Sequence, residues 1–169
     1  SSMRPTRRGE GRVPSHLHQY DAVVFGTGQW QSRYNWTIEQ TTQQVAWVMQ
    51  QLQALRAASP RHPRIIWQGT PAIPLHMMEG MRRVDGLPKD GYVPQKLDKR
   101  VNQRYHLLND LQLILAHCHQ FHAVDAFAIT HPHNNATPPI DFWGHYCSDA
   151  DNPVLRALVD GVVAAACPS

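Results

Sequence analysis

The chain has 169 residues, of which 42% are hydrophobic, a size and composition typical of one globular domain with a substantial core. It carries 16 basic and 13 acidic residues, but four arginines and one glutamate lie in the first twelve positions, so the remainder is neutral. A neutral body argues against nucleic-acid binding, and no apolar run approaches the roughly 20 residues of a membrane-spanning helix.

The first strand is predicted close to the amino terminus. Residues 1–20 are polar and show no apolar period, so we expect a flexible basic arm followed by one domain over 21–169. A continuous apolar run at 22–25 leads into a glycine-containing turn, which is the pattern of a strand buried on both faces, predicted over 21–26. Thr37 or Thr41 then begins a helix over 38–57, because each has a glutamine three residues later.

The later elements follow the same signals. Apolar runs predict two more strands, leucine spacing predicts a second helix, and Asn152-Pro153 opens a third. The predicted strands are 63–67 and 122–128, and the predicted helices are 97–118 and 153–166. This alternation predicts a three-layer α/β/α fold with a parallel, flavodoxin-like sheet. A free-standing sheet of this class has about five strands, so we expect its first strands to lie outside this chain.

Functional residues of a parallel sheet gather after the carboxyl ends of its strands. The loop after the first strand contains Gly26, Gly28, Gln29 and Trp30, where backbone N–H groups can form an oxyanion hole. The alternative is a structural turn that needs glycine for its backbone dihedral angles.

The loop after the last strand contains an acid and a histidine four residues apart, Asp141 and His145. The Asp141 carboxylate can accept a hydrogen bond from the imidazole Nδ1–H and leave Nε2 free as a base. With 11 histidines and 13 acids in the chain, such a spacing also arises by coincidence.

Histidines near Cys118 raise the alternative of a zinc site, since His117, His119, His122, His131 and His133 are close in sequence. No CxxC, HxxxH or HExxH motif occurs, so we predict no metal and interpret these residues as a polar helix end.

Three cysteines cannot all pair with one another, and we expect Cys147 and Cys167 to form a disulfide that ties the chain end to the Asp/His loop. Asn35 and Asn135 each begin an N-glycosylation triplet. These signals favour the lumen of the secretory pathway or the extracellular space.

Three stretches together resemble the later part of an SGNH/GDSL-type hydrolase, above all its PC-esterase branch of sugar O-acyl esterases and acetyltransferases. The stretches are 20–30, 64–67 with Pro71 and Pro74, and 124–127 followed by 141–146. The resemblance implies that His145 is the general base, Asp141 its orienting carboxylate, and the turn from Gly26 to Gln29 part of the oxyanion hole, with no cofactor.

The chain departs from the family pattern in three ways. Asp141 and His145 are four residues apart rather than three, and Gly28 stands where the family commonly has an asparagine. The block with the serine nucleophile is not found. Two hypotheses follow. In the first, the chain is part of an acyl-ester hydrolase or O-acyltransferase, and an amino-terminal segment or another chain supplies the nucleophile. In the second, it is an inactive binding or structural subunit of a larger assembly.

Overall fold

The computed structural model describes residues 17, 19–27, 36–72, 102–133 and 152–167. Within them, one three-stranded sheet has the order β1-β2-β3, with β1 at Ala22–Gly26, β2 at Arg64–Gln68 and β3 at His122–Val124. Both pairs of neighbouring strands are parallel. The predicted parallel α/β arrangement is therefore confirmed.

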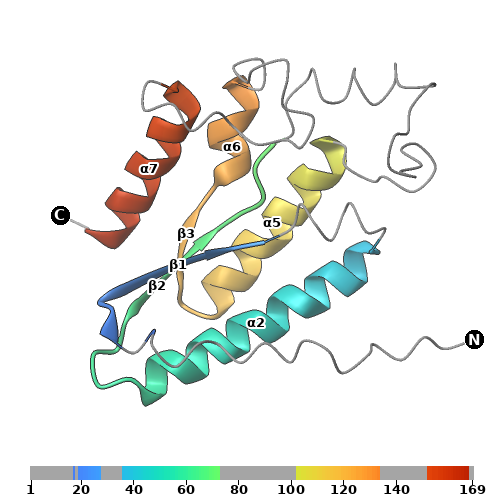
Figure 1. Cartoon of the computed structure of the whole chain (residues 1–169). Helices are drawn as coiled ribbons and strands as arrows, with labels where there is room; N and C mark the ends of the chain where they lie inside the picture. The colour runs from blue at the N-terminus through green and yellow to red at the C-terminus, as the bar shows by residue number, and fades with distance from the viewer. Residues whose placement is uncertain (1–16, 18, 28–35, 73–101, 134–151, 168–169) are drawn as a thin grey trace, which may run out of the picture.

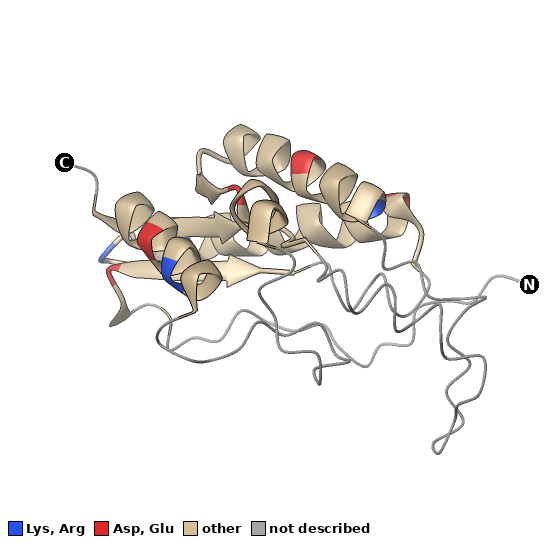
Figure 2. Cartoon of the chain, turned by 90° about the horizontal axis from the view of Figure 1, so that it is seen from above, with Lys and Arg blue, Asp and Glu red and all other residues tan. Residues whose placement is uncertain are grey.

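The helices lie on both faces of this sheet (Figures 1 and 2). They are α2 (Ile38–Ala58), α5 (Asn102–Cys118), α6 (Ala126–Thr130) with the 3₁₀ turn η2 (His131–His133), and α7 (Pro153–Ala166). Helices α2 and α5 pack together on one face, while α7 packs on the other against β2 and β3. No helix in these described ranges is long and apolar enough to cross a bilayer.

Helix α2 begins at the first of its two candidate caps. The Thr37 hydroxyl accepts from the Gln40 N–H at 3.1 Å, and the Gln40 side chain accepts from the Thr37 N–H at 2.9 Å. Thr41 is instead buried within the helix and donates its hydroxyl proton to the Thr37 carbonyl. Together these bonds satisfy amide groups that the first turn would otherwise leave unpaired.

The predicted third strand is too long. It ends at Val124 rather than at residue 128, because the Asp125 carboxylate accepts from the Ala128 N–H at 2.9 Å and caps helix α6. The apolar residues after Asp125 suit a buried strand or a buried helix equally well, and the cap decides for the helix.

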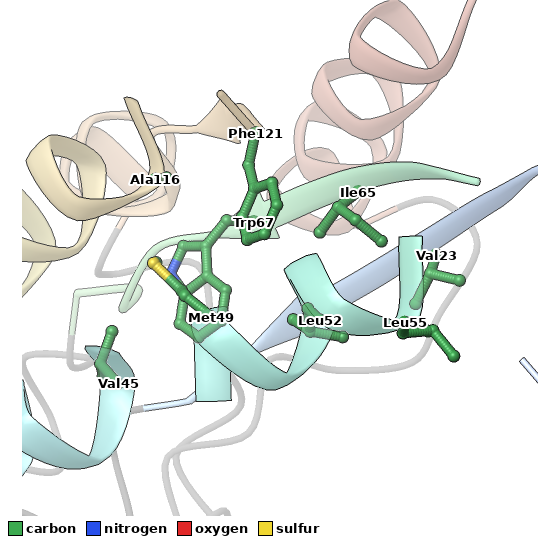
Figure 3. Packing of buried hydrophobic residues seen from close by; sticks show 9 residues of the cluster. All are labelled: Val23, Val45, Met49, Leu52, Leu55, Ile65, Trp67, Ala116 and Phe121. Atoms are coloured by element: carbon green, nitrogen blue, oxygen red, sulfur yellow. The ribbon is translucent and has the colours of Figure 1, made fainter. Parts of the chain in front are cut away.

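The core fills the space between the sheet and α2 (Figure 3). Its strand residues are Val23, Ile65 and Trp67, which point to the same face because side chains alternate along a strand. Helix α2 contributes residues at helical spacing, and the end of α5 and the turn after it close the cluster. These residues are Val45, Met49, Leu52, Leu55, Ala116 and Phe121.

The opposite face of β1 is partly exposed, so the prediction that this strand is buried on both faces was wrong. Val24 points away from α2 and is 46% exposed, whereas its register partner Ile66 is fully buried beneath α7. Among the described residues β1 pairs only with β2, so its outer edge carries no described strand. Helix α7 carries two further exposed valines, Val159 and Val163.

We expect substitutions on the two faces of β1 to differ in cost. Val23 is 6% exposed, so Val23→Ala should lower the free energy of unfolding by about 2 kcal/mol. Val24→Ala, at 46% exposure, should lower it by less than about 1 kcal/mol. Urea denaturation of both variants measures the difference, and equal losses would mean that the Val24 face is covered.

Candidate functional site

A buried glutamine connects the carboxyl ends of the first two strands. Gln112 of α5 accepts from the Trp67 indole N–H at 3.1 Å and donates to the Thr70 hydroxyl at 2.8 Å and the Thr27 carbonyl at 3.2 Å. Since the indole nitrogen can only donate, the Gln112 amide oxygen must face Trp67, and its NH₂ must face the threonines. The backbone at Thr27, directly after β1, is therefore fixed from inside the core.

The segment after β2 is fixed in the same way. The Thr70 hydroxyl donates to the Thr27 carbonyl at 3.0 Å. Two residues later, the Ala72 N–H donates to the Thr130 hydroxyl at 2.7 Å, and that hydroxyl donates to the Ala126 carbonyl within α6. These hydrogen bonds connect the segments that follow the carboxyl ends of all three strands, so the segments are held together at one edge of the sheet.

A second buried amide holds a carboxylate at this edge. The Asn109 NH₂ group of α5 donates to the Asp125 Oδ1 at 2.9 Å, the same oxygen that caps α6. The Asn109 oxygen is buried and has no hydrogen-bond partner in the structure. An unsatisfied buried acceptor costs about 1–3 kcal/mol of folding free energy. The Asn109 amide that positions Asp125 therefore lowers the stability of the fold locally.

Gly69 makes room for that amide. A Cβ at this position would lie 2.1 Å from the Asn109 oxygen, far closer than any packed contact. The sequence analysis assigned no role to Gly69 or Asn109, because their contact joins residues 40 positions apart.

A cavity of about 450 Å³ lies beside Asp125, between the first turn of α5 and the α6–η2 segment. Its walls include Asn102, Gln103, His106, Phe127 and His131. This size falls within the range of small-ligand sites, and the position is the one where parallel sheets bind ligands.

The cavity has an aromatic wall. The Phe127 ring stacks with His106 at a centroid distance of 4.8 Å and with His131 at 5.0 Å, both at interplanar angles of 25° or less. Both imidazoles are exposed to solvent, whereas Phe127 is buried. On the next turn of α5, Asp110 lies 3.7 Å from His106 Nε2.

An arginine in the first turn of α5 binds the backbone that precedes α2. Arg104 of α5 donates to the Trp36 carbonyl at 2.5 Å, at the beginning of α2. Burial lowers the pKa of Arg104 below its ordinary value. At the same helix end, a hydrogen bond from Thr37 lowers the pKa of Glu39.

Among the predicted site residues, Gly26 is described and ends β1. A Cβ at Gly26 would lie 2.7 Å from the Gln68 carbonyl oxygen, so close strand packing accounts for the glycine, and its role in an oxyanion hole stays a prediction. Cys118 and Cys167 carry exposed thiols. The other predicted residues lie outside the described ranges, namely Gly28, Gln29, Trp30, Asn35, Asn135, Asp141, His145 and Cys147.

The histidines near Cys118 make separate contacts. His119 hydrogen-bonds Gln53 at 2.8 Å and stacks on Phe121, while His117 and His122 are exposed. In the part of the chain that the structure describes, no group of three histidine, cysteine or acidic side chains is placed to hold a metal ion.

Comparison with protein-family models, with curated proteins and with solved structures found no match to this chain. Its function is therefore argued from its own residues and from the resemblance of the three stretches described above.

The Gln112 bonds predict a large loss of stability when the amide is removed. Gln112→Leu leaves the Trp67 N–H without its buried partner, so the free energy of unfolding should fall by about 2–3 kcal/mol. Gln103→Leu, an exposed position on the same helix, is the control and should change it by less than about 0.5 kcal/mol. Similar values for both variants in urea denaturation would contradict the assigned role of Gln112.

The contact between Gly69 and Asn109 predicts strong coupling. Gly69→Ala should cost more than about 2 kcal/mol alone, because the new methyl overlaps the Asn109 amide. In an Asn109→Ala background the overlap is gone, and the same change should cost less than about 1 kcal/mol. A double-mutant cycle measures this difference, and additive effects would exclude the contact.

Gly161→Ala is the matched control. A Cβ at Gly161 in α7 would lie 3.3 Å from the nearest side-chain atoms, which is tight but within reach of small adjustments. Helix propensity favours this substitution by roughly 0.5–1 kcal/mol, so its net effect should remain within about 1 kcal/mol and should not depend on Asn109.

Proposed function

We propose that this chain supplies the Asp141–His145 pair of an SGNH-type acyl-ester hydrolase or O-acyltransferase, and that the serine nucleophile comes from a segment outside it. In this proposal His145 Nε2 is the general base and Asp141 accepts from Nδ1–H. The substrate is an ester, with sugar O-acetyl groups as one candidate class. The family resemblance suggests these roles.

The observation that carries the proposal is the outer side of β1, which is about half exposed and carries no strand among the described residues. Parallel sheets are normally covered on both faces, yet Val24 is exposed and the described residues place no strand beyond β1. A further parallel strand at this edge would end beside Gly26, and a helix following it would cover Val24. A serine at the end of that strand would then face the turn after β1.

The anchors of the Asp/His segment lie at the same edge of the sheet. Helix α6 and η2 continue from the carboxyl end of β3, and α7 begins at the same end of the molecule and runs back (Figure 1). The described residues on either side, His133 and Asn152, therefore attach the segment that contains Asp141 and His145 to the carboxyl edge.

The chemistry assigns a separate task to each group. The His145 imidazole removes the proton of the serine hydroxyl as oxygen attacks the ester carbonyl, and Asp141 stabilises the imidazolium that forms. Backbone N–H groups in the turn from Gly26 to Gln29, beside Trp30, stabilise the oxyanion. The imidazolium then donates its proton to the departing alcohol, and water or an acceptor alcohol releases the acyl group.

A binding or structural subunit is the second candidate. The cavity beside Asp125 favours it, because its described lining offers a carboxylate, amides and imidazoles but no serine, cysteine, threonine or lysine. In this function the carboxyl edge recognises a partner without chemical turnover.

We also propose a secretory-lumen or extracellular location. Glycans on Asn35 and Asn135 require the glycosylating surroundings of the secretory pathway. Removal of N-glycans from the native protein, followed by mass measurement, tests this location independently of catalysis.

The Asp141–His145 pair predicts a characteristic imidazole proton. In ¹H NMR of the chain, His145 Nδ1–H should resonate far downfield because a carboxylate accepts its hydrogen bond, and Asp141→Asn should remove this signal. Asp110→Asn, which alters the other acid–histidine contact, is the control and should leave it unchanged. A spectrum unaffected by Asp141→Asn would overturn the assigned pair.

The same proposal predicts that the chain alone does not hydrolyse an activated acetyl ester above background, because the covalent step needs the absent serine. Turnover that disappears in His145→Ala would instead show that the nucleophile lies within these 169 residues.

A further inference from the structure

We propose that the cavity between the first turn of α5 and the α6–η2 segment binds a guanidinium group, presented as an arginine side chain of a partner peptide. This site is distinct from the proposed Asp141–His145 pair and does not depend on ester chemistry.

The first argument is the state of the Asp125 carboxylate. Its Oδ1 accepts from the Asn109 amide and from the Ala128 N–H, each at 2.9 Å, which fixes the orientation of the group. Its Oδ2 has no hydrogen-bond partner among the described residues, and the carboxylate lines the cavity. An oriented carboxylate with one open oxygen is an acceptor ready for a charged N–H donor.

The second argument is the penalty that accompanies this orientation. Asn109 keeps its NH₂ group on Asp125 although its own oxygen is buried without a partner. A structural cap alone does not require this, because the Ala128 N–H already binds Asp125. The extra, costly contact indicates that the position of the carboxylate matters beyond the helix cap.

The third argument is the flat aromatic wall. Phe127 stacks with His106 and His131, and both imidazoles are exposed. Guanidinium is planar and weakly hydrated, so it can lie on such rings while its N–H groups reach a carboxylate. A lysine ammonium group has no flat face and holds its water more strongly, so it fits this wall less well.

The fourth argument is charge. Among the described residues that line the cavity, Asp125 is the one that is formally charged at neutral pH, and Asp110 adds a second carboxylate next to His106. The positive end of α5 opposes a cation, but this effect decays within one turn and is weaker than a direct bond to a carboxylate.

The test is a titration of the ¹⁵N-labelled chain with N-acetyl-arginine N-methylamide, which presents the side chain as a peptide does. Three matched probes are compared with it. The citrulline derivative lacks the positive charge, the lysine derivative lacks the planar guanidinium, and free arginine carries its own carboxylate. We expect saturable shifts for the cavity residues with the arginine derivative and at least about tenfold weaker binding of the citrulline derivative.

The decisive variant is Asp125→Asn. Asparagine is as good an N-cap as aspartate, so α6 should remain folded while the charge is lost and affinity falls at least about tenfold. Asp160→Asn, at an exposed aspartate of α7, is the control and should bind as the unmodified chain does. His131→Ala should reduce the preference for arginine over lysine, a readout that a general loss of stability does not change.

Several outcomes would overturn the proposal. They are equal binding of the arginine and citrulline derivatives, unchanged affinity in Asp125→Asn, shifts confined to residues outside the cavity, and no saturation by the arginine derivative at millimolar concentration. Tighter binding of free arginine than of the capped derivative would favour a small-molecule site and exclude the peptide.

Discussion

The side-chain amide of Gln112 is the interaction on which the carboxyl edge of this sheet depends. Inside the core, its NH₂ group donates two hydrogen bonds and its oxygen accepts one. The partners are Trp67 in β2, Thr70 after β2 and Thr27 after β1. In such a low-dielectric setting each of these bonds is strong, and each would be costly to leave unmade. Because Trp67 determines which way the amide faces, the ends of β1 and β2 are held in one arrangement relative to α5.

The fold was predictable from the sequence wherever a local signal matched the tertiary structure. The apolar runs at β1 and β2 and the Thr37 capping box need only near neighbours, and both strands and the cap are confirmed, although β1 is buried on one face rather than on two. The boundary between β3 and α6 was not predictable, since its apolar residues suit either element. Asp125 ends the strand there and is itself held by Asn109, 16 residues away.

The described part of the site was less predictable, for a different reason. The reactive groups that the sequence pattern indicates are Asp141 and His145, which lie outside the described residues. Gln112, Asn109 and Gly69 carry no reactive group, and their importance comes from partners far along the chain. In the sequence, Gly69 looks like any other turn glycine. Only the packed structure shows that a side chain at this position would overlap the Asn109 oxygen.

The strand order relates the two proposed sites to each other. The outer edge of β1 and the strand β3, which Asp125 of the cavity follows directly, lie at opposite ends of the strand order. Neighbouring strands are about 4.8 Å apart, so the ends of β1 and β3 are separated by roughly 10 Å, a span that three or four extended residues cover. A peptide held by its arginine beside Asp125 therefore needs only a few further residues to span the distance to the carboxyl end of β1. One partner could therefore bind through its arginine at the proposed site beside Asp125 and also reach the proposed ester site at the end of β1. The two proposed sites use different residues.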